Sequence, residues 1–272
     1  MSYSLSDVCT VLERLWPADG AEEWDASGLV SGNLAAPVER IMLTVDAVAE
    51  TVDEAIGSNA DLLLAHHPLL LRGVTSVAED RYKGALLARL IRADCALVAA
   101  HTNADVVADG TSAVFAKLLG VQHTHPIVDG ERPGTGIGRI GRLEHPTTVG
   151  RLARRIADVL PATAGGIRAA GDYDAVVNTV ALCAGAGDAY LANEAVRSAD
   201  VYVTSDLRHH PASEAREQAR VAGGPALIDV SHWASEWLWL ETAARQLSEA
   251  LPEIAITISE TRTDPWDFAI VQ

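Results

Sequence analysis

Several short segments of this chain are apolar at every position and end abruptly in polar residues. Residues 62–65 read Leu-Leu-Leu-Ala, and His66, His67 and Pro68 follow directly. An unbroken apolar run of this length before a turn-forming residue is typical of a strand buried on both faces, as in parallel sheets covered by helices. Because open α/β sheets bind ligands beyond the carboxyl ends of their strands, we expect the two histidines to lie at a binding site.

Predicted strands and helices alternate along most of the sequence, which is the pattern of βαβ units. Residues 120–136, rich in glycine, proline and histidine, interrupt this alternation and form the best candidate boundary. We therefore expect two α/β domains, one made of residues 1–125 and 226–272 and a second one, residues 126–225, inserted into it. The predicted strands are residues 40–46, 62–65, 95–100, 137–143, 176–182, 201–206, 226–230 and 255–260, and the predicted helices are residues 4–16, 48–56, 83–93, 111–119, 148–160, 189–199 and 233–247.

Composition and charge narrow the classes of function. With 272 residues, of which 49% are hydrophobic and 21% charged, the chain can bury a large core. Its formal net charge of −16 disfavours nucleic acid and anionic membranes as partners, since both attract basic surfaces. Cys9, Cys95 and Cys183 lack Cys-x-x-Cys spacing, so we expect reduced thiols in a cytoplasmic protein. No signal peptide and no apolar run of about 20 residues is found, so no membrane span is expected.

Histidines follow three of the predicted strands, and carboxylates recur near two of them. Glu236 lies four residues beyond His232, a spacing that places both side chains on one face of a helix. Asp105 lies beyond the strand at 95–100. Each pair taken alone could equally be solvated or cap its element. Together the candidate metal ligands offer three imidazoles and two carboxylates, and they are His66, His67, Asp105, His232 and Glu236.

Five ligands exceed one tetrahedral zinc site and suit two divalent ions. Mixed nitrogen and oxygen ligation fits Zn, Fe, Mn, Co or Ni, and the sequence does not choose among them. Other polar residues at strand ends are expected near the site, as hydrogen-bond partners of ligands, as cleft lining or as structural groups. His209-His210-Pro211 copies the first histidine motif and could bind metal, line the cleft or cap a helix; we favour cleft lining. The cleft-lining candidates are Asp46, His101, Thr204, Asp206, Arg208, His209 and His210.

Two glycine-rich stretches resemble nucleotide-binding loops only in part. GIGRIG at residues 136–141 matches Gly-x-Gly-x-x-Gly, but no apolar strand precedes it and no helix follows, so we expect a strand and a turn. CAGAGD at residues 183–188 lies between a predicted strand and a predicted helix. It could hold a phosphate at a helix N-terminus, with Arg208 as a further contact, or it could be a tight structural turn.

The order of the motifs resembles the NIF-three-like family, whose members are commonly named GTP cyclohydrolase 1 type 2 homologues. The motifs are WDASGL, HHP, HTNAD, GIGRIG, CAGAGD, TSDLRHH, SHWASE and TDPW, and they span the chain from Trp24 to Trp266. The resemblance implies an α/β fold of two NIF-three-like domains, with a dinuclear metal site in the cleft between them, and a ring-shaped homohexamer. It also implies the same five metal ligands. The family's Gly-His-Tyr-x-x-Glu motif departs here, because Ser231 and Trp233 replace its glycine and tyrosine.

Two hypotheses about function follow. The first is a metal-dependent hydrolase that acts on a nucleotide or a related small molecule through water activated by two divalent ions. The alternative is a non-enzymatic metal-binding protein, such as a metal carrier, a sensor or a partner-binding ring. The ligand set is common to both, and fold and ligands do not fix the chemistry.

Overall fold

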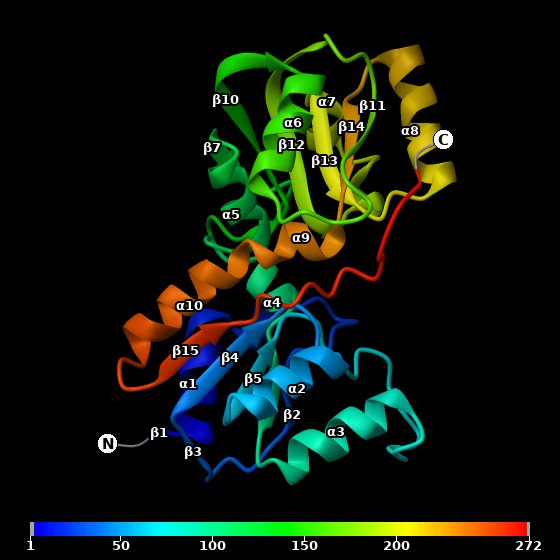
Figure 1. Ribbon diagram of the computed structural model, residues 1–272. Helices are drawn as coiled ribbons and strands as arrows, with labels where there is room; N and C mark the ends of the chain where they lie inside the picture. Colours follow the sequence, from blue (N-terminus) through cyan, green and yellow to red (C-terminus); the bar gives the residue numbers. More distant parts are fainter. Residues whose placement is uncertain (1–2, 271–272) are drawn as a thin grey trace. The chain divides into compact units, whose positions relative to one another are not determined.

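The computed structural model, which describes residues 3–270, is a mixed α/β protein with two large sheets (Figure 1). The chain divides into two compact units, each built around one of these sheets. Unit 1 consists of the chain up to Ala104 together with Leu240–Thr263. Unit 2 consists of Asp105–Trp239 and the chain from Asp264 onwards.

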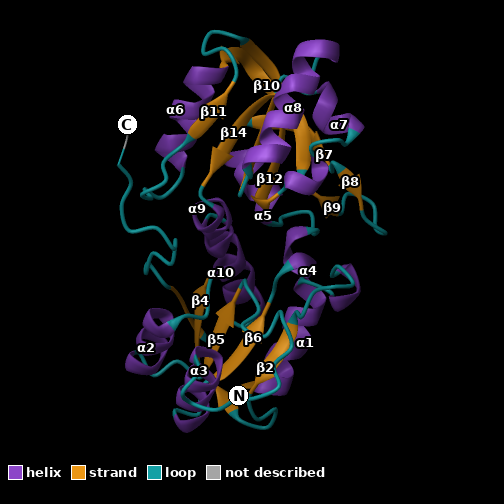
Figure 2. Cartoon of the chain, turned by 90° about the vertical axis from the view of Figure 1, so that its right-hand side faces the viewer, coloured by secondary structure: helices purple, strands orange, loops and turns teal. Residues whose placement is uncertain are grey.

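In the described part of unit 1, the sheet has five strands, four of them parallel. The strands at its centre are short and buried along their whole length, since they are covered on both faces. Helices α2 (Ala49–Gly57) and α3 (Tyr82–Arg92) lie on one face (Figure 2). In spatial order the strands are β15 (Ala255–Ile258), β4 (Arg40–Thr44), β5 (Leu62–Ala65), β6 (Ala96–Ala99) and the antiparallel β2 (Gly28–Ser31).

The described part of unit 2 contains a six-stranded mixed sheet. Its three central strands are parallel and its outer strands are antiparallel to their neighbours. In spatial order they are β11 (Arg168–Ala170), β14 (Ala226–Val230), β13 (Val201–Ser205), β12 (Val176–Ala186), β10 (Arg139–Thr148) and β7 (Val121–His125).

The boundaries between the two units differ from the domain boundaries expected from the sequence. Strand β14, expected in the first domain, pairs with β13 along its whole length, from Val201 opposite Ala226 to Ser205 opposite Val230. Strand β7 lies in the stretch expected to hold the boundary, and it pairs with β10. A strand gains its backbone hydrogen bonds from the strands beside it, and β14 lies between β11 and β13. Pairing therefore assigns 226–230 and 121–125 to unit 2.

The remaining elements are shorter or cover the sheets. A continuous helix was expected over 233–247, and the structure has α9 and α10 separated at Leu238. No helix within residues 3–270 is both long and apolar enough to cross a membrane. These elements are β1 (Tyr3–Ser4), α1 (Leu5–Leu15), β3 (Pro37–Val38), α4 (Thr102–Asp105), α5 (Thr111–Leu118), β8 (Val128–Asp129), β9 (Gly136–Ile137), α6 (Val149–Val159), α7 (Glu194–Ser198), α8 (His209–Ala222), α9 (His232–Trp237) and α10 (Trp239–Ala250).

Helix starts follow the local capping chemistry. Ser4 and Asp7 form a capping box at α1, in which the Ser4 hydroxyl accepts the Asp7 N–H and the Asp7 carboxylate accepts the Ser4 N–H. Helix α6 is capped by Thr148, whose side chain accepts the Arg151 N–H. The helix expected over 189–199 is reduced to a single 3-10 turn and the five-residue α7, because β12 continues as far as Ala186.

Replacing Leu63 by alanine tests the packing of the sheet in unit 1. Leu63 is fully buried in β5 and contacts the apolar side chains of α2 and α3. Loss of its side chain leaves a cavity and is expected to cost about 2–5 kcal/mol of unfolding free energy. The matched control is Ile91→Ala on the exposed face of α3, where the side chain is 61% exposed. Urea unfolding should show a large drop for the first variant and a small one for the second; equal drops would contradict the packing described.

Candidate metal centre

Two histidines leave the carboxyl end of β5 in unit 1. The backbone stays extended past the strand, because the N–H of His66 donates to the carbonyl of Thr44 at 2.9 Å and the N–H of His67 to Val45 at 2.8 Å. Continued pairing with the segment after β4 holds both residues at the edge of the sheet. His66 is buried, with 1% of its surface exposed, while His67 is partly exposed.

A third histidine joins them from the neighbouring parallel strand. His101 follows β6, which pairs with β5 in register, and the N–H of Ala100 donates to the carbonyl of Ala65. One ring nitrogen from each of His66, His67 and His101 lies within 4.8 Å of the other two. Such a group of nitrogens fits a metal ion. From the sequence, His101 was expected only among the cleft-lining residues, although its position after a predicted strand pointed to the same sheet edge.

Each of the three rings is oriented by an oxygen atom on its Nδ1 side. Nδ1 lies 2.8 Å from the Ala100 carbonyl oxygen in His66 and 2.7 Å from Asp46 Oδ1 in His67. In His101 it lies 2.7 Å from Asp25 Oδ1. A neutral ring donates its Nδ1 proton to such an oxygen and therefore carries its lone pair on Nε2, the arrangement usual for metal-binding histidines.

Asp25 was not among the candidates, and the structure makes it the partner of His101. Besides the imidazole, its carboxylate accepts hydrogen bonds from the hydroxyls of Ser27 and Thr102, at 2.7 and 2.5 Å. Burial raises the pKa of this carboxyl, but the hydrogen bonds from His101, Thr102 and Ser27 outweigh burial and hold the pKa well below its usual range. Asp25 is therefore a fixed anion behind the ring. The signal available in the sequence was the polar turn Asp-Ala-Ser-Gly after Trp24.

In unit 2, His232 and Glu236 form a pair at the start of α9. Ser231 caps this helix through a hydrogen bond from the Ala234 N–H. His232 Nε2 lies 3.0 Å from Oε1 of Glu236, and its Nδ1 lies 2.7 Å from Oδ2 of Asp206. Glu236 is buried, with 4% of its surface exposed. Both ring nitrogens thus face carboxylates.

The two carboxylates control the proton affinity of His232. Burial lowers the pKa of the ring, but the negative charge of Glu236 and the hydrogen bonds to Asp206 and Glu236 raise it well above its usual value. In the metal-free protein the ring is therefore held as an imidazolium. A divalent cation that binds at Nε2 has to displace this proton.

Asp105 lies in unit 2, and hydrogen bonds fix both its side chain and the segment that follows it. Its Oδ1 accepts a hydrogen bond of 2.5 Å from the Thr111 hydroxyl. Arg139, only 3% exposed, donates to the carbonyls of Val107, Gly136 and Gly138. The GIGRIG motif therefore has the predicted form of strand and turn, and its arginine clamps the segment that follows Asp105.

The electrostatics of Cys183 connect Asp105 with Glu236. Burial, together with the negative charges of Asp105 and Glu236, raises the pKa of the Cys183 thiol to about 12. A thiol with this pKa stays protonated, so Cys183 is a packed apolar group rather than a metal ligand. Both predicted carboxylate ligands therefore lie close enough to Cys183 to raise its pKa.

The CAGAGD motif makes room for Glu236 instead of binding an anion at a helix N-terminus. Strand β12 runs through Ala186, and no long helix begins there. Gly185 has a φ of +70°, and a Cβ atom built on it would overlap Oε1 of Glu236. Its N–H donates to the Ser235 hydroxyl, and its carbonyl accepts from Thr204. Only glycine combines this backbone with this close approach.

The structure separates the remaining cleft-lining candidates. Thr204 is fully buried behind Gly185, and Asp206 directly contacts His232. His210 is exposed in the first turn of α8, with its ring beside that of His209. Arg208 forms an ion pair with Asp188.

Comparison with known proteins decides the family. The family model described as Duf34/NIF3 (NGG1p interacting factor 3) matches residues 3–265. The chain belongs to the Duf34/NIF3 family. It is 47% identical to the Streptomyces coelicolor protein named "GTP cyclohydrolase 1 type 2 homolog", over 96% of this chain and 93% of that one. A Mycobacterium leprae protein of the same name is 34% identical, over 98% of this chain and 96% of its own length.

Solved structures have the same fold. A crystal structure of a Staphylococcus aureus hypothetical protein matches with a TM-score of 0.88 and 25% identity, over 99% of this chain and 100% of that one. The structure of a Bacillus cereus protein related to NIF3 matches with a TM-score of 0.87 and 23% identity, over the same shares. The expected NIF-three-like α/β fold is therefore confirmed.

Replacing Gly185 by alanine should disturb the Glu236 carboxylate. Gly166→Ala is the matched control, since Gly166 has a similar φ of +58° but open space around the missing Cβ. The control should lose about 1–2 kcal/mol from backbone strain alone. Gly185→Ala should lose about 1–3 kcal/mol more, because the new methyl group overlaps Glu236. Equal losses in chemical unfolding would mean that Gly185 is not needed to seat Glu236.

The titration of His232 in the metal-free protein tests its electrostatic setting. NMR should give this ring a pKa above the ordinary value of about 6.5, and Asp206→Asn should lower it. A raised pKa stabilises the folded protein at pH values below about 6.5, and this contribution is lost as the pH rises through the folded-state pKa. Titration at or below 6.5 in the unsubstituted protein would contradict the arrangement.

Proposed function

We propose that this protein binds two divalent metal ions through His66, His67, Asp105, His232 and Glu236 and hydrolyses a nucleotide or a related small molecule. The observation that carries the proposal is the orientation of the histidines. His66, His67 and His101 each have Nδ1 against an oxygen atom, so Nε2 is the atom suited to a metal ion. In His232, Nδ1 faces Asp206 and Nε2 faces Glu236, the other proposed ligand on α9.

The donor set fits a metal better than it fits acid–base catalysis by one histidine. Three imidazole nitrogens within 4.8 Å of one another would repel each other if the rings were protonated, and a cation bound at Nε2 removes that conflict. The buried Glu236 and the hydrogen-bonded Asp105 supply carboxylate oxygens, the donors that complement imidazole at Zn, Fe, Mn, Co or Ni. His101 offers a sixth donor.

Two ions are proposed because the donors exceed the needs of one. Unit 1 carries His66 and His67, and unit 2 carries Asp105, His232 and Glu236. In the proposal these five residues would hold the two ions, which would supply Lewis acidity.

The chain's own residues define what happens around such a centre. Asp25 and Asp46 hold two rings in the tautomer that presents Nε2. Glu236, whose Oε1 faces His232 Nε2 at 3.0 Å, would hold an ion through its carboxylate. Bound divalent ions would act as Lewis acids and would lower the pKa of a bound water molecule towards neutral pH. The substrate class comes from relatives named "GTP cyclohydrolase 1 type 2 homolog". The ring-shaped homohexamer and the cytoplasmic location stay predictions of the sequence.

Metal content tests the ligand assignment. His67→Ala should remove most of the metal that the unsubstituted protein retains after dialysis, because loss of an imidazole ligand weakens metal binding. His210→Ala is the matched control, since it too removes one imidazole from a His-His-Pro motif, but at an exposed position. Elemental analysis should separate the two variants while circular dichroism shows both folded. Unchanged metal in His67→Ala would sink the assignment.

A turnover screen tests the hydrolase. The metal-loaded protein, offered nucleoside mono-, di- and triphosphates, should convert at least one of them, and Glu236→Ala should reduce the rate by at least about a hundredfold. Metal-loaded protein with no turnover above this variant would contradict the enzymatic function, and it would leave the metal assignment to be judged by metal content alone.

A further inference from the structure

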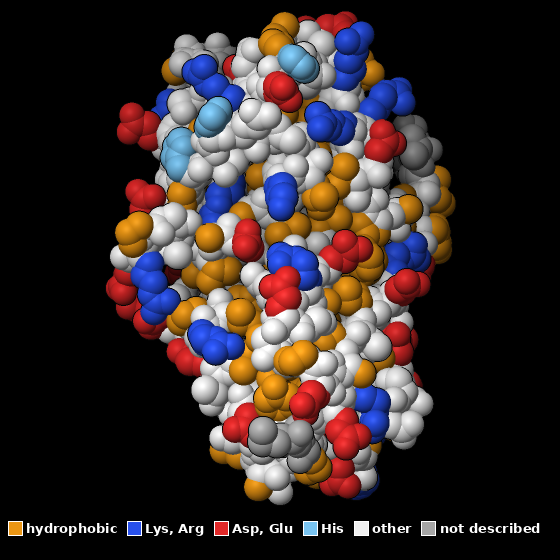
Figure 3. Space-filling view, turned by 90° about the vertical axis from the view of Figure 1, so that its left-hand side faces the viewer, with side chains coloured by type: hydrophobic (Ala, Val, Ile, Leu, Met, Phe, Trp, Pro, Cys, Tyr) orange, Lys and Arg blue, Asp and Glu red, His pale blue; other side chains and the backbone are white. Residues whose placement is uncertain are grey.

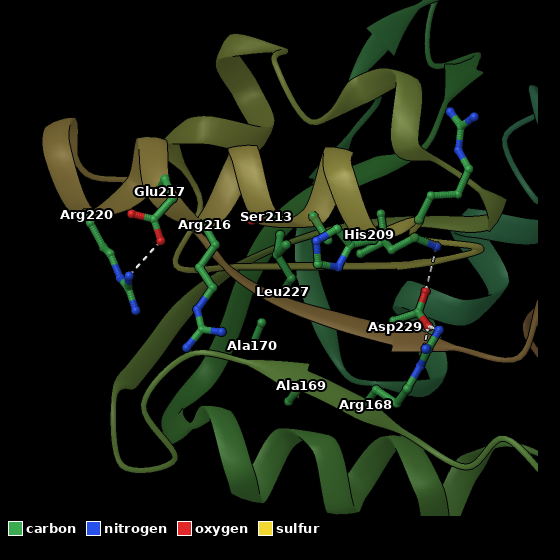
Figure 4. A pocket seen from close by; sticks show the side chains of 13 residues that line it. Arg168, Ala169, Ala170, His209, Ser213, Arg216, Glu217, Arg220, Leu227 and Asp229 are labelled. Carbon is green, nitrogen blue, oxygen red and sulfur yellow. Dashed lines mark hydrogen bonds and ion pairs between the residues drawn. The ribbon is translucent and has the colours of Figure 1, made fainter. Parts of the chain in front are cut away.

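A pocket of about 470 Å³ lies in unit 2 between helix α8 and strands β11 and β14 (Figure 4). Ala169, Ala170 and Leu227 give it an apolar floor, and Arg216 extends from α8 towards Ala170. Pockets of this size hold small molecules. None of the 13 lining residues belongs to the proposed metal ligands.

The pocket is positively charged although the chain is strongly acidic. Four arginines line it together with the carboxylates of Glu217 and Asp229, and Asp188 next to the lining pairs with Arg208. This leaves a formal surplus of one positive charge in a chain of net charge −16. On the face drawn in Figure 3, basic and acidic side chains are interspersed. A cationic hollow in an acidic protein concentrates anions. The four arginines, here called the arginine pocket, are Arg168, Arg208, Arg216 and Arg220.

Ion pairs occupy three of the four arginines only in part. Asp229 accepts from Arg168 and also from the Leu207 N–H, Glu217 binds Arg220, and Asp188 binds Arg208. Within residues 3–270, Arg216 has no carboxylate partner. Each guanidinium has five N–H donors, and an ion pair uses one or two of them. The arginine pocket therefore has N–H donors that can bind an anion, above all those of Arg216.

The start of α8 adds to the same field. This 14-residue helix begins at His209, which lines the pocket, and no side chain caps it. No acidic residue lies in its first turn. The partial positive charge of the helix N-terminus is therefore not neutralised locally, and it adds to the arginine charges.

We propose that the arginine pocket binds a phosphate monoester with a small organic body. Guanidinium groups match the geometry of phosphate oxygens and bind them with two parallel hydrogen bonds. The apolar floor between the arginines is suited to the organic body, whereas an inorganic ion would leave it in contact with water. The site is independent of the metal centre, so it does not depend on the proposed function.

Calorimetry with three probes tests the proposal on the full-length protein in low salt. The probes are adenosine 5′-monophosphate, adenosine and inorganic phosphate. We expect the monophosphate to bind more tightly than either of the other two, and to bind equally with and without a chelator. Arg216→Gln should weaken its binding about tenfold, the effect of losing a hydrogen bond to a charged group. Arg151→Gln, which removes an exposed arginine of α6, should leave binding unchanged.

Each other outcome overturns the proposal. Equal affinities in Arg216→Gln and Arg151→Gln would remove the arginine pocket as the site. Loss of binding on adding chelator would place the probe at a metal instead. Inorganic phosphate as tight as the monophosphate would eliminate the role of the apolar floor, and absence of binding would exclude the ligand class. Arg216 is exposed, so its replacement is not expected to unfold the chain, and circular dichroism checks this.

Discussion

A hydrogen bond between Nδ1 and an oxygen atom fixes each of the three proposed histidine ligands, and a bond of the same kind fixes His101 beside His66 and His67. The acceptors are a backbone carbonyl, at Ala100, and three carboxylates, those of Asp25, Asp46 and Asp206. Each bond selects a ring orientation and adds negative charge behind it, so a cation is favoured on the opposite side. Without these acceptors the same imidazoles could rotate or change tautomer, and their proximity alone would not define a metal site.

Thr263 and Asp264, near the end of the described chain, form hydrogen bonds beside the proposed ligands. In unit 1 the Thr263 hydroxyl donates at 2.5 Å to Oδ2 of Asp46, the carboxylate behind His67. In unit 2 the hydroxyl of Ser231, beside His232, donates at 2.5 Å to Asp264. Two adjacent residues of the TDPW motif therefore form one hydrogen bond each beside a proposed histidine ligand, Thr263 behind His67 and Asp264 next to His232. This gives a physical role to a motif that the sequence offered only as part of a family resemblance.

The sequence predicted those parts of the protein that follow from local pattern. Fully apolar segments became the central parallel strands, His66 and His67 follow one of these strands, and His232 begins α9. Asp105 is instead the last residue of α4. The local pattern did not show which sheet a strand joins. The apolar sequence of residues 226–230 fits a strand in either unit, and only its pairing with Val201–Ser205 assigns it to unit 2. CAGAGD looked like a strand followed by a helix, yet the strand continues because Gly185 has to pass beside Glu236. Asp25 was missed because its partner, His101, lies 76 residues away.

Anomalous diffraction from crystals grown with manganese or zinc tests the central claim most directly. Two anomalous peaks are expected for each chain at the proposed ligands, with histidine Nε2 atoms about 2.0–2.1 Å from zinc. Every Nδ1 should keep its oxygen partner. Peaks bound through Nδ1, or peaks located away from these histidines, would contradict the account.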